Sequence, residues 1–358
     1  MNAKILWPDL LIALPTVLLL SLGSIVIYSQ DPKFAVQQVI FAVLGLVVFW
    51  AISLFNFEIE SPLIKLLYFI NLGLLAITFI IGFETRGSLR WLQIGPLQLQ
   101  PSELAKPVLI LFLSRFWANH TASWKNIIIS LLFVLPFAVL IFKQPDLGTA
   151  LTIVAIWLSL LLAANVSLLK LASLSLISLC LAPLAWFSLK DYQKSRILSF
   201  LSPENDPLGT GYNVIQSTIA VGSGQIFGRG LGRGTQTRLR FLPEFRTDFI
   251  FASIAEELGF LASFSVLVLY SILVIRIFKI VRSVSGKFGI LVLYGVLGMF
   301  FFQITVNIGM NIGVVPVTGI TLPLLSYGGS SLLSTMISLG LVASIARYNI
   351  KRNTFIDS

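Results

Sequence analysis

The sequence predicts an all-α polytopic membrane protein, and two observations carry this prediction. Hydrophobic residues make up 56% of the 358 residues and charged residues only 11%, with a mean hydropathy of +0.93. This composition leaves too little polar surface for a water-soluble globule. Long apolar runs also recur along the whole chain. Helices are favoured over open sheets because a sheet edge leaves unpaired backbone groups in lipid.

About ten apolar runs are long enough to cross a membrane as helices of roughly 17–25 residues. We expect them near residues 9–29, 35–55, 63–83, 104–119, 126–142, 147–163, 168–189, 249–275, 288–312 and 322–346. The run after Lys4 is too long for a signal-peptide core and lacks a clear cleavage site, so we interpret it as an uncleaved first span. Residues 1–358 are therefore predicted to form one transmembrane domain, with a long extracytoplasmic loop at about 190–248 between spans seven and eight.

The distribution of Lys and Arg orients the predicted bundle. With both termini in the cytoplasm, the inner loops and span ends hold Lys4, Lys65, Arg115, Lys125, Lys170, Arg276, Lys279, Arg282, Lys287, Arg347, Lys351 and Arg352. The short outer loops and span ends then hold only Lys33, Arg86, Arg90, Lys106 and Lys143. This excess of inner positive charge supports cytoplasmic termini. The 190–248 loop falls outside, because long loops are translocated largely regardless of their charge.

Two residue types that occur once each limit the chemistry. Cys180 is the only cysteine, so no intrachain disulfide can form, and we expect this residue to be buried in its apolar run. His120 is the only histidine, which excludes a histidine-based triad and a multi-histidine metal site. A general base must therefore be a carboxylate, a lysine or a tyrosine.

The segment 241–259, FLPEFRTDFIFASIAEELG, is the most informative part of the sequence. It closes the long loop and opens an apolar helix, so Asp248 is expected where water meets the membrane. Glu256 and Glu257 follow about two turns later in the same helix. Carboxylates inside a membrane helix are costly and usually mark a functional path or a partner. We therefore take Asp248 as the candidate general base and Glu256 as a candidate cavity residue.

Charged residues also gather in two shorter outer loops. Glu103 and Lys106 lie three apart at a predicted helix start and share one helix face. They either form an ion pair that favours the helix dipole or line a polar cavity, and the sequence leaves both alternatives open. Arg90 precedes them in the same loop as a further candidate. Asp146 follows Pro145 and is favoured as a helix cap, with a binding role left open.

The long loop contains a glycine-rich stretch, GSGQIFGRGLGRG, at residues 222–234. No strand precedes it, so a dinucleotide-binding or P-loop interpretation fails its structural context. Flexible backbone with Arg229 and Arg233 could still wrap a pyrophosphate through N–H groups and guanidinium groups. Alternatively, the glycines only allow the loop to pack tightly on the bundle. A basic outer loop suits an anionic lipid head group, although a solvated loop that touches lipid non-specifically is the plain alternative.

The segment 307–331, NIGMNIGVVPVTGITLPLLSYGGSS, interrupts two predicted spans around Pro316 and Pro323. Broken membrane helices are tolerated only where protein or water satisfies the freed backbone groups. We therefore expect a polar cavity that opens to the outer side, with Ser326 among its lining residues. Transporters use the same device, so this feature alone does not identify an enzyme.

Several segments together resemble those of the SEDS (shape, elongation, division and sporulation) family, most of all its RodA group, which is related to FtsW. They are RGSLRWL, QPSELAK, KQPDLGT, PLGTGYNVIQS, GSGQIFGRGLGRG, FLPEFRTDFIFASIAEELG and LPLLSYGGSS, in the expected order over nearly the whole chain. The resemblance implies a ten-span bundle and a peptidoglycan glycosyltransferase that polymerises lipid II. It places this reaction on the outer face of the bacterial inner membrane during cell elongation. The implied partners are a class B penicillin-binding protein and other elongation-complex proteins.

The resemblance also assigns roles to individual residues. The family's essential acid matches Asp248, and its cavity-lining pair matches Glu103 and Lys106. The PLGTGYNVIQS match adds Gln216 and Ser217 as candidate substrate residues.

One position departs from the family pattern. The family commonly has His where this chain has Arg246. An Arg beside Asp248 is expected to lower the pKa of that carboxyl and so weaken it as a base.

The residues match the chemistry of this reaction. An acceptor hydroxyl must lose a proton as it attacks the anomeric carbon of lipid II, and one carboxylate as general base contributes about 10²–10⁴-fold. The leaving undecaprenyl pyrophosphate needs positive charge from Lys, Arg or a divalent cation such as Mg²⁺ or Mn²⁺. Arg229, Arg233 and Arg240 are the candidates for this contact. The change from an α-linked donor to a β-linked polymer implies inversion in one displacement, and neither an organic cofactor nor nucleic acid is expected.

Two other functions remain as alternatives. A lipid II flippase would also need broken helices and a charged cavity, but it requires a polar path through the membrane. The polar elements here gather on the outer side. A non-catalytic scaffold of the cell-wall machinery would leave the carboxylates in the membrane helices without a role.

Overall fold

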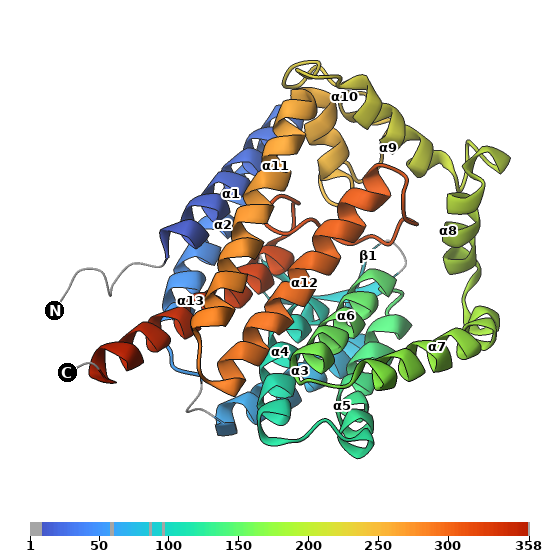
Figure 1. Cartoon of the computed structure of the whole chain (residues 1–358). Helices are drawn as coiled ribbons and strands as arrows, with labels where there is room; N and C mark the ends of the chain where they lie inside the picture. Colours follow the sequence, from blue (N-terminus) through green and yellow to red (C-terminus); the bar gives the residue numbers. More distant parts are fainter. Residues whose placement is uncertain (1–8, 58–60, 86–87, 95–96, 357–358) are drawn as a thin grey trace.

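The computed structural model describes residues 9–57, 61–85, 88–94 and 97–356. Within these residues, ten long helices run back and forth and form one bundle (Figure 1). They are α1 (Leu10–Gln30), α2 (Pro32–Ser53), α3 (Ser61–Ile81), α4 (Pro101–Asn119), α5 (Trp124–Lys143), α6 (Leu147–Ala163), α7 (Leu168–Ser188), α11 (Ile250–Ser283), α12 (Lys287–Asn311) and α13 (Gly329–Ile356).

The apolarity of these helices makes the chain a multi-pass membrane protein. Among the described residues, 7 helices are long and apolar enough to cross a membrane, and α6 and most of α7 form shorter apolar helices. The ten predicted spans all overlap the long helices, while the number that actually cross stays a prediction. Lys4 and Arg86, which entered the orientation argument, lie outside the described residues.

Polar side chains fix where several of the helices begin. Asp9, Asp31, Ser123 and Asp146 precede α1, α2, α5 and α6, and each accepts a backbone N–H from the first turn that follows. Such caps satisfy donors that have no partner inside the helix. The helix starts are therefore encoded locally, by one short polar residue before each apolar run.

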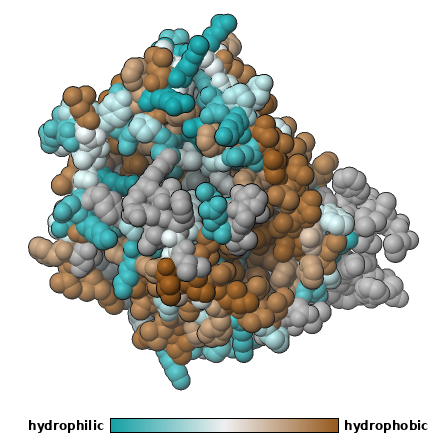
Figure 2. Space-filling view, turned by 180° about the vertical axis from the view of Figure 1, so that it is seen from behind, coloured by the Kyte–Doolittle hydropathy of each residue, from teal (hydrophilic) through white to brown (hydrophobic). Residues whose placement is uncertain are grey.

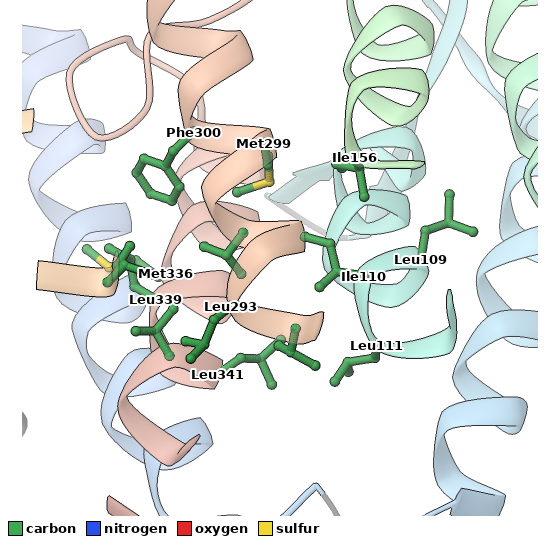
Figure 3. Packing of buried hydrophobic residues seen from close by; sticks show 14 of the residues in the cluster. Leu109, Ile110, Leu111, Ile156, Leu293, Met299, Phe300, Met336, Leu339 and Leu341 are labelled. Carbon is green, nitrogen blue, oxygen red and sulfur yellow. The ribbon is translucent and has the colours of Figure 1, made fainter. Parts of the chain in front are cut away.

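The core is centred on α12, which packs against α4, α6 and α13. Figure 3 shows Leu293, Met299 and Phe300 of α12 among side chains from these three helices, such as Ile156 and Leu339. All of them are buried. Because lipid tails are as apolar as these residues, the helices are held by close packing, which a dense apolar core supplies.

The surface shows the two environments of a membrane protein. Figure 2 shows hydrophobic side chains over much of the flank, and hydrophilic ones gathered at the end of the bundle that carries α9 and α10. The prediction that Cys180 is buried is wrong, because this residue is exposed. It lies on α7, at the edge of the bundle (Figure 1), where apolar side chains face outward instead of a neighbouring helix.

A small antiparallel sheet joins α3 to α4 and was not predicted by the all-helical interpretation. Its strands β1 (Phe83–Thr85), β2 (Ser88–Ile94) and β3 (Leu97–Leu99) pair in chain order. Backbone N–H and C=O groups of the three strands therefore bind each other at the edge of the bundle. We call the end of the bundle that carries this sheet and residues 190–248 the loop end.

The long loop is partly helical. It contains α8 (Asp191–Leu201), the 3-10 helix η2 (Pro203–Asn205), α9 (Tyr212–Ser223) and α10 (Thr235–Arg238). Figure 1 shows these elements arching over the loop end, from α7 to the start of α11. The turn-rich stretch expected after residue 200 is therefore followed by a regular helix, α9, that packs against α11 and α12.

Two of the predicted helices are broken or shortened at the loop end. The helix α11 is interrupted at Gly259, whose φ of 77° no ordinary helical residue adopts. Glu256 and Glu257 thus belong to a short outer piece and not to one continuous span. Residues 322–328, predicted to be helical, are irregular, and α13 begins only at Gly329. Leu324 has a φ of 71°, outside the right-handed helical region, so a helix cannot run through this stretch.

Candidate active site

Two buried amides of α12 hold the backbone of Asp248. The side chains of Asn307 and Asn311 donate to the Asp248 carbonyl, with N–O distances of 2.9 and 3.1 Å. Asn307 also donates to the carbonyl of Ile320, and the side-chain Oδ1 of Asn311 accepts the N–H of Ala252 in α11. Buried amides with every contact satisfied form a rigid network. They tie the end of α12 to the start of α11.

The two residues before Asp248 are held from the other side, by the irregular segment that leads into α13. The N–H of Tyr327 donates to the carbonyl of Arg246 at 2.8 Å. The hydroxyl of Ser326 donates to the carbonyl of Thr247 at 2.5 Å and accepts the N–H of Leu322 at 2.8 Å. Three consecutive carbonyls, at positions 246–248, are thus bound by the segment 307–327. Ser326, a predicted cavity residue, therefore lies next to the candidate base and fixes its loop.

The carboxylate of Asp248 lies beside Gly319 and Arg196. A β-carbon added to Gly319 would lie 3.4 Å from Asp248 Oδ2 and 3.7 Å from Arg196 Nη1. Gly319 has a φ of 74°, and both charged residues are partly exposed. A carboxylate and a guanidinium group therefore flank one small residue at the loop end. The positive φ, more than the spacing, is what favours glycine at this position.

Sequence reasoning did not identify Arg196, Gly319, Asn307 or Asn311 as site residues. Arg196 belongs to α8, so only the folded loop brings it near Asp248. In the sequence it is one of several basic residues in a basic loop. The two asparagines carried a usable signal, because amides in an otherwise apolar span need partners.

Arg246 pairs with a carboxylate other than the one expected. Its Nη1 lies 3.0 Å from Oδ2 of Asp31, the capping residue of α2, and its guanidinium group stacks over the ring of Phe34 at 4.0 Å. The ion-pair partner of Arg246 is thus Asp31 and not the neighbouring Asp248. The Arg246 side chain thus contacts the start of α2, and the predicted effect of Arg246 on Asp248 stays a prediction.

Glu103 and Lys106 form the predicted ion pair on the first turns of α4. Lys106 Nζ lies 2.6 Å from Glu103 Oε2, and the two residues are only 1% and 6% exposed. Ser334 of α13 donates its hydroxyl to the Glu103 carbonyl at 2.7 Å. Taking two charges out of water is costly unless the pair is well formed. The contact is confirmed, and whether it lines a substrate cavity stays a prediction.

Asp146 is a helix cap, as favoured by the sequence. Its Oδ1 accepts the N–H of Thr149 in the first turn of α6 at 3.1 Å, and its Oδ2 accepts the side-chain amide of Gln100 at 3.0 Å. Arg90 on β2 donates to the carbonyls of Gln144 and Pro145, just before this cap. Arg90 and Asp146 therefore join the sheet, the end of α5 and the start of α6.

Ser217 and Gln216 lie on α9, at the point where this helix meets α12. The Ser217 hydroxyl donates to the Asn311 carbonyl at 2.8 Å and is fully buried. Gln216 is partly buried beside it. Asn311, which holds Asp248, thus also anchors the long loop. It therefore links α9 directly to the candidate base.

The glycine-rich stretch packs against the break in α11. The N–H groups of Arg229 and Gly230 donate to the carbonyls of Glu256 and Glu257, both at 2.9 Å. A β-carbon at Gly228 would collide with the backbone of Glu257, so only glycine allows the two backbone segments to lie this close. Of the two interpretations left open, tight packing is the one observed. These backbone N–H groups are used inside the protein and do not form a pyrophosphate cradle.

Glu256 holds the start of α10. Its carboxylate accepts the N–H groups of Gln236 and Thr237, at 2.8 and 3.1 Å, and the hydroxyl of Thr235 at 3.3 Å. The residue is 0% exposed. Its oxygens are therefore engaged by donors of the loop itself. We interpret Glu256 as a structural residue that anchors the loop, in place of the predicted substrate-cavity role.

The three arginines proposed for the leaving group lie on the surface of the long loop. Arg229, Arg233 and Arg240 are exposed. Arg229 donates to the Ser223 carbonyl and to the Thr235 hydroxyl. The guanidinium group that the structure places beside Gly319 and Asp248 belongs instead to Arg196.

The donor set bears on the predicted divalent cation. Among the residues that the structure describes, no group of three or more His, Cys, Asp or Glu side chains is arranged to hold a metal ion. Mg²⁺ is often bound by one or two carboxylates together with substrate phosphates. Asp248 is a residue that could supply such a carboxylate, and a cation bound with the substrate stays a prediction.

Comparisons with known proteins match this chain over nearly its full length. The model of the family FTSW_RODA_SPOVE, described as cell cycle protein, matches residues 2–351. Stage V sporulation protein E of Bacillus subtilis is 36% identical, covering 98% of this chain and 100% of the relative. Peptidoglycan glycosyltransferase MrdB of Escherichia coli K12 is 37% identical, covering 96% of each. A probable peptidoglycan glycosyltransferase FtsW of Nitrosococcus halophilus is 38% identical, covering 94% of this chain and 92% of the relative.

Solved structures match the fold as well as the sequence. A chain from a peptidoglycan synthase complex, described as coordinating polymerization and crosslinking, superposes with a TM-score of 0.83 and 35% identity. The match covers 96% of this chain and 99% of that one. The rod shape determining protein RodA of Thermus thermophilus superposes with a TM-score of 0.72 and 29% identity, covering 96% of this chain and 97% of that one.

Proposed function

Because this chain belongs to the FTSW_RODA_SPOVE family and is a peptidoglycan glycosyltransferase, we propose that it polymerises lipid II with Asp248 as the general base. The observation that carries this proposal is the fixed position of Asp248. Its backbone is bound by Asn307 and Asn311, while its carboxylate lies beside Gly319 and Arg196. A base held within reach of an accessible space is what proton abstraction from an acceptor requires.

The proposed step is a single displacement. The acceptor sugar hydroxyl attacks the anomeric carbon of the donor, and Asp248 takes the hydroxyl proton as the new C–O bond forms. The bond between that carbon and the pyrophosphate oxygen breaks, and its electron pair leaves with the pyrophosphate. Arg196 is placed to stabilise this developing charge. A divalent cation, when bound with the phosphates, supplies further positive charge at the same place.

The reaction is assigned to the loop end, on the outer face of the cytoplasmic membrane, with both termini in the cytoplasm. The charge distribution of the sequence supports this orientation. A flippase would need a polar path to the opposite face, whereas the candidate base and the polar elements around it gather at the loop end. The match to a rod shape determining protein supports a role of this activity in cell elongation.

The central test is the change Asp248→Asn in purified protein, with polymer formed from lipid II as the readout. The amide keeps the size of the side chain and removes the base. Asp206→Asn is the matched control, because Asp206 is an exposed aspartate of the same loop whose carboxylate accepts the N–H of Thr210. Loss of polymerisation in the first variant alone supports the assignment. A normal polymer yield from Asp248→Asn would sink it.

The proposed partner is a class B penicillin-binding protein, whose single membrane helix would pack on the apolar flank of the bundle. The solved peptidoglycan synthase complex that matches this chain supports such an assembly. We expect the partner to co-purify in mild detergent and to raise the polymerisation rate, since conformational steps often limit such enzymes. An unchanged rate in a reconstituted complex would remove the regulatory part of this proposal.

A further inference from the structure

Two aspartates at opposite ends of α1 each cap a helix and bind an arginine. Asp9 caps α1, accepting the Leu11 N–H, and accepts from Nε of Arg276 in α11 at 2.5 Å. Asp31 caps α2 and accepts from Arg246, which precedes α11, at 3.0 Å. Both pairs therefore connect the α1–α2 region to the chain of α11. They differ in what the arginine belongs to, because Arg276 is part of a helix and Arg246 is part of the loop that carries Asp248.

The first turns of α2 bind this loop through more than the ion pair. The Arg246 guanidinium group stacks over Phe34 at 4.0 Å. The edge-on contact between the rings of Phe34 and Tyr327, with centroids 5.1 Å apart, links the same turn to the irregular segment before α13. The Tyr327 hydroxyl donates to the side-chain oxygen of Gln37 at 2.5 Å. The first turns of α2 thus contact both segments next to the candidate base, through Arg246 in one and Tyr327 in the other.

The contact is transmitted to Asp248 through a short and fixed path. Arg246 lies two residues before Asp248, and its carbonyl accepts the Tyr327 N–H. The Asp248 carbonyl is bound from the opposite side, by the amides of α12. The loop therefore lies between two anchors, α2 on one side and α12 on the other. Releasing the α2 anchor removes the contact that holds the Arg246 side chain, and leaves the loop to the α12 amides and to the backbone contacts of Ser326 and Tyr327.

We propose that Asp31 and Arg246 are positioning residues, which place the Asp248 carboxylate by fixing its loop against the start of α2. The side chains of Arg246 and Asp31 are 22% and 26% exposed, so the ion pair is partly buried at the surface of the loop end. Its effect on the reaction comes through position, because a misplacement of about 1 Å can cost about 10²-fold in rate. This inference rests on the proposed role of Asp248 as the base.

The test uses changes that keep the helix cap. Asp31→Asn retains an oxygen for the cap of α2 and removes the charge that binds Arg246. Arg246→Gln removes the same contact from the other side, and Arg246→Lys keeps the charge without the planar stacking group. Asp9→Asn is the matched control, since Asp9 is also a cap with an arginine partner, far from the site. The readouts are kcat and KM for lipid II, the thermal unfolding midpoint, and amide hydrogen exchange of residues 241–249.

We expect Asp31→Asn and Arg246→Gln each to lower kcat by roughly 10-fold, part of the ~10²-fold cost of a misplaced group, with KM little changed. The double variant should be no slower than the slower single variant, because coupled neighbours are not additive. Arg246→Lys should recover part of the rate. Hydrogen exchange should become faster in 241–249 for the first two variants, while Asp9→Asn should leave kcat and this exchange unchanged.

Failure of this inference can be distinguished from failure of the proposed function. Hydrogen exchange reports the loop itself and does not depend on which residue is the base. If Asp248→Asn is inactive while Asp31→Asn keeps normal kcat and normal exchange, the positioning role is overturned and the base assignment stands. Additive losses in the double variant, or a change in KM alone, would overturn it as well. Normal activity of Asp248→Asn would instead contradict the proposed function.

Discussion

Asp248 and Glu256 lie eight positions apart in one segment of the sequence, yet their carboxylates lie in different surroundings, one partly exposed and the other buried. Glu256 is 0% exposed, and its oxygens accept donors from the start of α10. At Asp248 the backbone carbonyl is bound by the amides of α12, and the carboxylate is partly exposed beside Gly319 and Arg196. A carboxylate surrounded by fixed backbone donors stabilises a fold. A carboxylate carried on a fixed backbone, with its side chain at an accessible place, can take part in chemistry.

The largest expected effect separates activity from stability. Asp248→Asn should lower polymerisation by about 10²-fold or more, the usual contribution of a general base, while the thermal unfolding midpoint stays close to that of the unchanged protein. Initial rates and unfolding curves of one protein preparation check both statements. A large drop in the unfolding midpoint would place Asp248 with the structural carboxylates and remove the contrast.

The pair Glu103–Lys106 adds a third kind of carboxylate, one that is paired with a buried cation. Removing one partner of a buried ion pair costs about 3–5 kcal/mol, because the other charge is left without compensation. Glu103→Gln and Lys106→Met should each damage stability and activity, and the double change should cost less than the two single effects added together. Strict additivity, measured by unfolding and by polymerisation, would show that the two residues act separately.

Glu256→Gln should show the reverse of Asp248→Asn. Gln keeps one of the two oxygens, so its NH2 group opposes one of the two N–H donors, which is expected to cost about 1–3 kcal/mol of stability. Hydrogen exchange should become faster in residues 224–240, with activity falling only as far as the loop is disordered. A variant with normal stability and no activity would instead give Glu256 a chemical role.

The smallest effect concerns the cation beside the candidate base. Arg196→Gln should lower kcat by roughly 10-fold, less than the ~10² or more lost with a donor to a developing oxyanion. Lys194→Gln is the matched control, because Lys194 lies on the same short helix and two positions along an α-helix do not share a face. Equal rates for the two variants would mean that Arg196 does not contact the leaving group.

The sequence predicted those parts of the molecule that depend on local signals. Long apolar runs gave the helices, and the cap at Asp146 and the pair Glu103–Lys106 followed from spacing within single segments. The loop-end sheet was missed because two of its strands are only three residues long, too short for an alternating pattern to stand out.

The rest of the candidate site depends on contacts between segments far apart in sequence. Arg196 reaches Asp248 only through the path of the long loop, and Arg246 finds Asp31 across 215 positions. The sequence predicted a span from residue 322, whereas α13 begins at Gly329. Hydrogen bonds of Ser326 satisfy the irregular stretch before it, which a hydropathy pattern assigns to the span. No periodicity within a single segment contains this information.

The break at Gly259 has a consequence for how the protein is assembled. Backbone groups of residues 225–230 and 256–261 exchange hydrogen bonds in both directions, so each stretch satisfies groups that the other leaves open. The ribosome makes the first stretch about thirty residues before the second, and unpaired backbone groups are costly in lipid. The glycine-rich stretch must therefore remain in water until the start of α11 arrives. Closure of the loop end therefore begins only when the eighth long helix enters the bundle, and it needs α12 and the segment 307–327 for the remaining contacts.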